Sequence, residues 1–346
     1  MKLSRKLGIF LKYLLPRPSR IYNLIMLYLS KSLRLTRLLN KPITAMIEPT
    51  NYCNLHCPLC PTGAGLIKRK PENLSFEDFK KILDNLGSSI IHVRLWNWGE
   101  PFLNKDFSKM VRYAKSKKIF VNTSTNSSFL NEKIMVELID SGLDQLIVSL
   151  DGASEETYNK YRKNGDFKKV VLSLKKISEI KKSRGINYPE VKLQFIVMRH
   201  NEHEISEVIK LAKFTGVNTV FFKTVGIMDP ELKKDIEKYI PQNKKFRRYF
   251  SMENELKSPK LSSGICNYLW EEATVNVDGS MVSCCRDAHG KYVFGNLKEQ
   301  NISKIWNSPK MVNFRKTILN NKNRIDICQS CSGSNKEFVI KEVKIN

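Results

Sequence analysis

The first 47 residues contain no Asp or Glu, although they carry ten Lys and Arg residues. They also lack a long apolar run. The longest uncharged stretch is Ile21–Ser30, whereas a helix needs about 20 apolar residues to cross a membrane. No signal peptide is indicated, because Lys12 interrupts the first apolar run and no small-residue cleavage site follows. We therefore expect neither a membrane-spanning segment nor a cleaved leader.

Segment 1–43 instead interleaves its basic residues with Leu, Ile and Phe. This mixture is typical of helices that lie on an anionic membrane surface, here with a break at Pro16 and Pro18. The alternative is that the segment packs on the rest of the chain and leaves its lysines in solvent. Nucleic acid is not expected as a partner, because no nucleic-acid-binding module is recognisable and few aromatic residues are present to stack bases.

The sequence also shows no catalytic triad, no pair of catalytic carboxylates and no internal repeat. Its 59 Lys and Arg against 34 Asp and Glu favour an acidic or phosphorylated substrate. The eight cysteines fall into the groups 53/57/60, 266/284/285 and 328/331. Such clusters are typical of metal binding in a reducing compartment rather than of a disulfide framework. We expect a cytoplasmic protein, peripheral at the inner face of the membrane if segment 1–43 binds lipid.

Three cysteines, Cys53, Cys57 and Cys60, follow one another at CxxxCxxC spacing after the apolar run Thr44–Ile47. A 4Fe–4S cluster normally has four cysteine ligands, so three leave one iron with an open position where chemistry takes place. The alternative is a structural zinc site that adds His56 or a distant residue. Zinc sites usually pair two separate cysteine knuckles, whereas these cysteines crowd one loop. The spacing therefore favours a cluster.

From residue 41 onward, short β-rich runs alternate with helical stretches, a pattern typical of a parallel sheet. The expected strands are Ala45–Pro49, Ile90–Leu95, Ile119–Ser124, Gln145–Leu150, Lys192–Met198 and Thr219–Thr224. Helices are expected between them, beginning at Ser75, near 104–106, at Asn131 and at Ser154, with a last one over Glu202–Thr215. Six such units are too few for a complete eight-fold barrel. The polar stretch 229–262 then indicates a linker.

A small cysteine-rich module is expected after the linker. The turn Asp278-Gly279 between two alternating runs predicts a β-hairpin. A helical stretch over Ile302–Leu319 follows. The candidate metal ligands are Cys266, Cys328, Cys331 and either Cys284 or Cys285. Four thiolates from this set complete a coordination shell, and a zinc ribbon with four cysteine ligands is the alternative to a cluster.

The first cysteine motif resembles the signature of the radical S-adenosylmethionine (SAM) enzymes. The resemblance implies an α/β fold, in which a partial (β/α)6 TIM-like radical SAM barrel precedes a small α+β cluster-binding module. It also implies that Cys53, Cys57 and Cys60 hold a 4Fe–4S cluster whose open iron binds the amino and carboxylate groups of SAM. An electron from that cluster cleaves SAM to methionine and a 5′-deoxyadenosyl radical in this family.

Further segments at the expected strand ends resemble SAM-binding elements of the same family. Trp98-Gly99-Glu100-Pro101 is similar to the family's GGEP element, with Trp98 in place of the first glycine. The resemblance implies that Glu100 accepts hydrogen bonds from the ammonium group of SAM and that Gly99 lets the backbone approach. It implies Ser149 as a ribose or carboxylate contact and Arg162 as a partner of the carboxylate. Ordinary turns and a surface arginine are the alternative interpretations.

The second cysteine set is similar to the auxiliary-cluster module called SPASM, or twitch in its shorter form. In that module a first cysteine precedes a glycine that is followed by four residues and a second cysteine, as in Cys266, Gly279 and Cys284. Cys284 is therefore the preferred ligand and Cys285 its alternative, and the resemblance implies one auxiliary 4Fe–4S cluster. The expected organisation is a basic amphipathic arm (1–43), the barrel (44–228), the linker (229–262), the auxiliary module (263–335) and a tail (336–346).

The resemblance implies a radical SAM oxidoreductase that abstracts hydrogen from a substrate C–H bond and receives electrons from a flavodoxin- or ferredoxin-type donor. A single auxiliary cluster implies that it accepts the electron left on the substrate. We expect oxidation or modification of a small, glycosidic or lipid-linked molecule at the membrane surface. A peptide maturase or sulfatase-maturase-like enzyme is the second expectation, and a non-catalytic zinc or RNA-associated protein is the third.

Overall fold

The computed structural model describes residues 10–14, 17–248, 250–252, 255–257, 265–329, 331 and 339–345. The parts of the expected arm, linker and tail that fall between these ranges lie outside the described residues. Ten described strands form one sheet in the order β11-β10-β9-β1-β2-β3-β4-β5-β6-β12.

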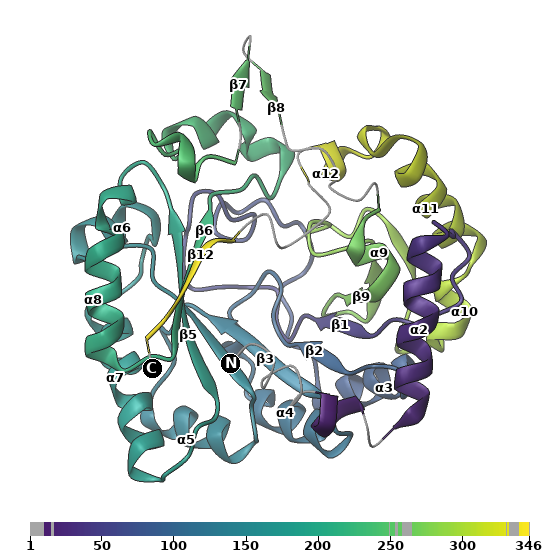
Figure 1. Cartoon of the computed structure of the whole chain (residues 1–346), viewed down its shortest axis with the longest axis horizontal. Helices are drawn as coiled ribbons and strands as arrows, with labels where there is room; N and C mark the ends of the chain where they lie inside the picture. Colours follow the sequence, from purple (N-terminus) through teal and green to yellow (C-terminus); the bar gives the residue numbers. More distant parts are fainter. Residues whose placement is uncertain are drawn as a thin grey trace.

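The central part of this sheet consists of six parallel strands in chain order. They are β1 (Thr44–Ile47), β2 (His92–Arg94), β3 (Phe120–Thr125), β4 (Gln145–Ser149), β5 (Glu190–Val197) and β6 (Thr219–Thr224). The connecting helices are α3 (Phe76–Leu86), α4 (Phe107–Ser116), α5 (Glu132–Asp140), α6 (Glu155–Tyr161), α7 (Phe167–Ser183) and α8 (Ile205–Thr215). These helices cover the outer side of the sheet (Figure 1). The expected partial (β/α)6 barrel is confirmed, with two helices between β4 and β5.

The helix starts follow from local capping. The Ser75 side chain accepts a hydrogen bond from the Asp78 amide at 3.1 Å, and Asn131 accepts one from the Ile134 amide at 2.9 Å. Ser154 begins α6 with a capping box. Each cap satisfies an amide that the first helical turn leaves without a partner. These starts agree with the sequence-based expectation.

The cysteine-rich module extends the barrel sheet at β1. Strand β9 (Glu272–Val275) pairs parallel with β1, and β10 (Ser280–Val282) and β11 (Val293–Asn296) follow antiparallel. The turn between β9 and β10 contains Gly279, whose φ of +85° lies in the region that favours glycine. The remaining elements are α9 (Asn267–Glu271), α10 (Ile302–Trp306), α11 (Pro309–Asn321) and α12 (Asp326–Gln329). The stretch expected as one helix over 302–319 is therefore two.

Helices in the linker were expected, whereas strands in the linker and in the tail were not. The linker includes a 3₁₀ helix over Pro230–Lys238 and a short hairpin of β7 (Phe250–Met252) and β8 (Glu255–Lys257), which projects from the molecule (Figure 1). In the expected tail, β12 (Val339–Lys344) pairs antiparallel with β6. The tail thus contributes the strand at the far edge of the sheet.

The described part of the N-terminal arm packs on the barrel and on the module. A π-helical turn (Phe10–Leu14) precedes α2 (Pro18–Ser32), in which Arg20 is buried and donates hydrogen bonds to four carbonyls, including Lys117 and Lys118 after α4. Further along, the Asn307 side chain bonds both the amide and the carbonyl of Leu38 at 2.9 and 2.8 Å. Among the described helices, none is both long enough and apolar enough to span a membrane.

Candidate active site

The loop after β1 brings the first three cysteines to one side of a cavity. The Cys60 amide donates a hydrogen bond to the Cys57 carbonyl at 3.1 Å, which closes a turn in the loop. Gly63 packs directly against it, since a Cβ there would lie 2.4 Å from the Cys57 nitrogen. The Cys53 Sγ accepts hydrogen bonds from the Leu55 amide and the Asn126 side chain, each at 3.4 Å.

One cavity of about 220 Å³ collects every residue that the sequence assigned to the first cluster and to SAM. The lining includes Cys53, Cys57, Cys60, Gly99, Glu100, Ser149 and Arg162. The three cysteines follow β1, Gly99 and Glu100 follow β2, Ser149 ends β4, and Arg162 follows α6. The carboxyl ends of parallel strands meet at one edge of a sheet. The structure therefore brings the seven residues together, while their individual roles stay predictions.

Glu100 is buried and is held by three donors. Its Oε1 accepts from the Thr125 hydroxyl at 2.6 Å and the Phe102 amide at 3.3 Å, and its Oε2 accepts from the Asn126 amide at 2.8 Å. Burial nevertheless raises the pKa of Glu100 to about 7, because desolvation outweighs these hydrogen bonds. A ligand cation beside Glu100 would lower this pKa and favour the ionised carboxylate. The site therefore suits a ligand with an ammonium group.

Gly99 is required by a close backbone contact. A Cβ at Gly99 would lie 2.2 Å from the Thr50 carbonyl oxygen. The neighbouring Trp98 carbonyl accepts a hydrogen bond from the Thr62 hydroxyl. The Gly99 segment is thus clamped against both ends of the cysteine loop. Close approach of the backbone to SAM was the expected reason for this glycine, whereas its contact with the cysteine loop already excludes a side chain.

Arg162 does not present a free guanidinium fork to the cavity. Its Nε and Nη2 donate to Asp151 at 2.6 and 2.5 Å, and its Nη1 lies 3.8 Å from the Cys57 Sγ. Although burial lowers it, the pKa of Arg162 is held well above its usual value by Asp151 and Cys57. Arg162 is therefore a permanent positive charge beside the cysteine loop. Asp151 and Asn126, which the sequence analysis did not select, are both part of this site.

The remaining polar residues near the loop differ in exposure. The Ser149 hydroxyl accepts a hydrogen bond from Gln194 Nε2 at 3.3 Å and lines the cavity. His56 is exposed, and its ring Nδ1 forms a hydrogen bond with the side-chain Nδ2 of Asn164 at 2.7 Å. The main-chain amide of His56 donates a hydrogen bond to the Lys163 carbonyl at 3.1 Å. His56 therefore points away from the three thiols and is not arranged as their fourth ligand.

Within the module, Cys284 and Cys331 are buried, and Cys266, Cys285 and Cys328 are half-buried. Cys266 precedes α9, Cys284 follows β10, and Cys328 and Cys331 lie at α12. Burial raises the pKa of Cys284, and the neighbouring thiols at 285, 266, 328 and 331 raise it further. The pKa of Cys285 is raised by burial and then chiefly by Glu272, and Cys285 lines a second cavity. This arrangement favours Cys284 as the ligand, and the assignment stays a prediction.

The second cavity, of about 410 Å³, lies between the two cysteine sets. Cys285 and Cys331 line it. It shares part of its wall with the first cavity, namely Trp96, Asn97, Trp98, Ser124, Gln194, Lys223 and Met228. The two cavities are therefore contiguous and connect the two sets of cysteines.

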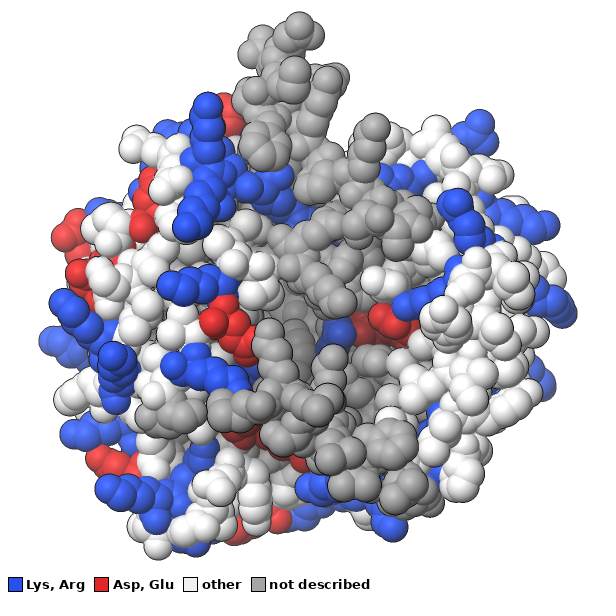
Figure 2. All heavy atoms as spheres, in the orientation of Figure 1, with Lys and Arg blue, Asp and Glu red and all other residues white. Residues whose placement is uncertain are grey.

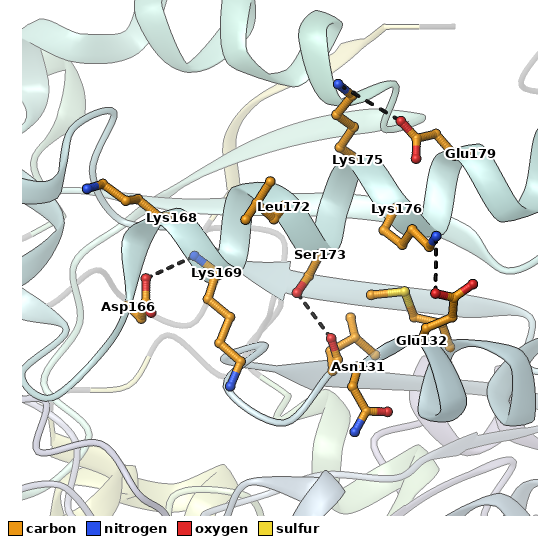
Figure 3. A pocket seen from close by; sticks show the side chains of 12 residues that line it. Asn131, Glu132, Asp166, Lys168, Lys169, Leu172, Ser173, Lys175, Lys176 and Glu179 are labelled. Carbon is orange, nitrogen blue, oxygen red and sulfur yellow. Dashed lines mark hydrogen bonds and ion pairs between the residues drawn. The ribbon is translucent and has the colours of Figure 1, made fainter.

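A third hollow, of about 570 Å³, lies outside the barrel between α5 and α7 (Figure 3). Its lysines project around the exposed Leu172, and three of them pair with carboxylates: Lys176 with Glu132 at 3.1 Å, Lys168 with Glu155 at 3.8 Å and Lys175 with Glu179 at 4.0 Å. None of the predicted site residues lines this groove. It is a solvated helix surface and is separate from the candidate active site.

The geometry defines a class of protein: an α/β barrel enzyme with one cysteine set at each end of a buried cavity. Residues 47–212 match the model of the radical SAM superfamily, and residues 266–332 match that of the iron–sulfur cluster-binding domain called SPASM. The chain therefore belongs to the radical SAM family and carries a C-terminal SPASM-type module. Its cofactors are 4Fe–4S clusters and SAM, and the thiol-lined cavity with its buried carboxylate fits both. Among the described residues, no group of three His, Cys, Asp or Glu is arranged to hold a single metal ion.

Relatives and solved structures agree with this assignment. The mycofactocin maturase MftC of Mycolicibacterium smegmatis is 31% identical over 178 residues, which are 51% of this chain and 43% of that protein. The match thus spans less than half the length of that relative. A GTP 3′,8-cyclase of Clostridium botulinum is 24% identical over 80% of this chain and 85% of its own.

Two solved structures share the fold. BtrN in complex with AdoMet and 2-DOIA has a TM-score of 0.55 and 19% identity, covering 86% of this chain and 98% of its own. SuiB of Streptococcus suis, bound to S-adenosylmethionine, has a TM-score of 0.62 and 13% identity, covering 89% of this chain and 75% of its own. The expected fold class is confirmed.

Proposed function

We propose that this radical SAM enzyme oxidises or modifies a small molecule bound in the cavity between its two cysteine sets. The contiguity of the two cavities is the observation that carries this proposal. A substrate in the shared part lies next to the SAM site and also next to the auxiliary cysteines. Net oxidation needs both neighbours, since hydrogen abstraction leaves an electron that must be removed.

The side chains of the chain prepare the site for this chemistry. Cys53, Cys57 and Cys60 would hold the first cluster, which would supply the electron for reductive cleavage of SAM, and the auxiliary cysteines would hold the second cluster, which would accept the electron left on the substrate. Glu100 holds the ammonium group of SAM, and Ser149 contacts its ribose or carboxylate. Trp96, Trp98 and Met228 wall the shared part and exclude water from a reactive radical.

Anaerobic reconstitution tests the proposal. Iron analysis is expected to give about eight irons per chain, in keeping with two four-iron clusters. Dithionite and SAM should then yield 5′-deoxyadenosine, measured by mass spectrometry, and Cys57→Ala should abolish it. A reconstituted protein that keeps its iron yet never cleaves SAM would refute the enzymatic proposal.

The auxiliary ligands can be separated by a matched pair of substitutions. Cys284→Ala should reduce the iron content towards about four per chain, because four thiolates normally hold one cluster. Cys285→Ala removes a neighbouring thiol and should leave the iron content unchanged. The reverse result would exchange the two assignments.

The electron donor is proposed to dock where the cysteine loop reaches the surface. His56, Lys163 and Asn164 are exposed there, and Arg162, the neighbour of Lys163, lies 3.8 Å from the Cys57 Sγ. Flavodoxin- or ferredoxin-type donors carry acidic surfaces that complement such a patch, and complementary charge speeds association.

The outer face of α2 supports the proposal of a cytoplasmic enzyme that binds an anionic membrane. It exposes Tyr22, Ile25, Tyr28 and Leu33, each by more than half of its surface. Figure 2 shows a largely uncharged surface over α2 with Lys and Arg at its border. Apolar side chains that insert between basic neighbours are typical of interfacial helices.

Flotation with liposomes tests this surface. Binding should require anionic lipid and should weaken in a Tyr28→Ser, Leu33→Ser variant. Leu172→Ser is the matched control, because Leu172 is equally exposed on the far-removed groove of Figure 3. Equal flotation of both variants, or no binding by the wild type, would remove the membrane from the proposal.

Peptide maturation is the second candidate function. It is favoured by the 31% identity over 178 residues with a protein named mycofactocin maturase. Incubation with candidate precursor peptides, followed by mass spectrometry, decides between the two. A mass change in a peptide that depends on SAM and dithionite would favour the second candidate.

A further inference from the structure

The wall shared by the two cavities contains hydrogen-bond donors that have no acceptor. Trp98 Nε1 and Asn97 Nδ2 are both buried and have no hydrogen-bond partner. Both residues line the first cavity and the second. A buried donor without a partner costs about 1–3 kcal/mol, so such atoms usually meet an acceptor. The acceptor for these two is therefore expected to come from a ligand in the cavity.

The charged side chains along the second cavity have one sign. Arg94, Lys223 and Arg286 line it, and no Asp or Glu is among its described lining residues. Arg94 is paired with Glu272 behind the wall at 3.1 Å. The Lys223 Nζ donates to Gln194 Oε1 at 3.3 Å and lies in the shared wall, where Trp98 and Asn97 also lie.

The other titratable residues that line the second cavity are His92, Tyr268, Cys285 and Cys331. His92 bonds Asn122 at 2.8 Å, and burial lowers its pKa to about 4, so that it is neutral at physiological pH. Trp98 Nε1 and Asn97 Nδ2 thus line a cavity whose described charged lining residues are basic, and a ligand without an acceptor atom would leave these two donors without a partner. A carboxylate or phosphate supplies both the acceptor atoms and the compensating charge.

We propose that the shared wall binds an anionic oxygen group of the substrate, a carboxylate or a phosphate, through Trp98 Nε1, Asn97 Nδ2 and Lys223 Nζ. This inference rests on the proposed function, which makes the cavity the substrate site. It assigns a role to Trp98, the residue that departs from the GGEP pattern of the family. Trp98 is then a specificity determinant of this chain, because glycine in its place would offer no side-chain donor.

The competing occupant of these donors is SAM, whose own carboxylate lies in the neighbouring site. The two are separated by measuring anion binding after SAM has saturated the enzyme. Methyl phosphate and acetate serve as anionic probes, and trimethyl phosphate and acetamide serve as their uncharged counterparts. Anaerobic calorimetry on the SAM-loaded holoenzyme then reports binding without any turnover.

The wild type is expected to bind one equivalent of at least one anionic probe and neither uncharged counterpart. The stronger of the two anions identifies the substrate group as a phosphate or a carboxylate. Trp98→Phe keeps the aromatic wall and deletes the donor, and Lys223→Met deletes the charge at similar length. Each should weaken anion binding tenfold or more, since a hydrogen bond to a charged group is lost. Lys176→Met, in the outer groove of Figure 3, should leave anion binding unchanged.

Four results would overturn the proposal. They are no anion binding by the wild type, equal binding of the uncharged probes, unchanged binding in both wall variants, or loss of binding in Lys176→Met. A Trp98→Phe variant that loses SAM affinity as strongly as anion affinity would assign the donors to the cofactor instead. Failure of the enzyme to cleave SAM refutes the proposed function separately, because calorimetry reads anion binding in the same sample.

Discussion

Replacement of Arg162 by Met tests whether the guanidinium is structural or free to bind SAM. Asp151 is fully buried and receives two hydrogen bonds from Arg162 and one from the Ile196 amide at 2.6 Å. Arg162→Met leaves this carboxylate charged and buried with only the amide. Removal of one partner of a buried ion pair destabilises a protein by about 3–5 kcal/mol. We expect a loss of this size in the free energy of unfolding.

Urea unfolding of the iron-free protein measures the loss without interference from clusters. The double variant Arg162→Met, Asp151→Asn should recover much of it, because the uncompensated charge is gone. Lys160→Met is the matched control: its pair with Glu156 is exposed on the same helix, and exposed pairs contribute about 1 kcal/mol at most. A loss below about 1 kcal/mol in Arg162→Met, with SAM affinity abolished, would refute the structural role and restore the sequence-based one.

Other perturbations of the same site have equally definite outcomes. Gly99→Ala should prevent cluster loading, measured as iron per chain, because its Cβ would meet the Thr50 carbonyl at 2.2 Å; full iron content would contradict the clamp. Burial raises the pKa of Glu100 from 4.5 to about 7 in the folded protein. The protonated carboxyl therefore contributes to the free energy of unfolding below pH 4.5, and this contribution is lost as the pH rises to 7. The stability of wild type relative to Glu100→Gln should therefore fall by about 3 kcal/mol between pH 4.5 and 8 in urea titrations of the iron-free protein; a flat difference would contradict the buried charge. Lys163→Glu should slow flavodoxin-driven SAM cleavage several-fold more than dithionite-driven cleavage, whereas the exposed Lys210→Glu on α8 should change neither; equal slowing by both reductants would remove the docking surface.

The features that sequence predicted well are local in the chain. The caps at Ser75, Asn131 and Ser154 depend on a side chain and an amide three residues away. The turn at Gly279 depends on one backbone angle. The six parallel units follow from the alternation of short runs. Each of these signals is complete within a few residues, so it can be read without knowing the fold.

The features that sequence did not predict join distant segments. Nothing near residues 339–344 indicates that they pair with β6, and the stretch was expected to be a tail. Arg162 was predicted as a site residue that contacts SAM. Its guanidinium instead donates hydrogen bonds to Asp151, which lies eleven positions away in the sequence. The unpartnered donor of Trp98 likewise becomes visible only when the neighbouring walls are in place. Side-chain roles in a buried site therefore need tertiary geometry even when the residues themselves are evident.

The pairing of β9 with β1 explains why the two cysteine sets lie at neighbouring, contiguous cavities. Ile47 ends β1 and is followed by the first cysteine loop, whereas Val275, its partner in the register, ends β9 and is followed by the turn and by β10, after which Cys284 comes. Side chains beyond the paired strands also connect the barrel with the module. The buried Glu48 carboxylate accepts two hydrogen bonds from Arg69, at 2.7 and 2.9 Å, and one from the Val277 amide at 3.1 Å. Arg69 belongs to the stretch that follows the cysteine loop, so loop and hairpin share one buried carboxylate. A shift of either cysteine set would break this ion pair, whose disruption costs about 3–5 kcal/mol. The separation between the sets is thus fixed by the sheet and its buried charge.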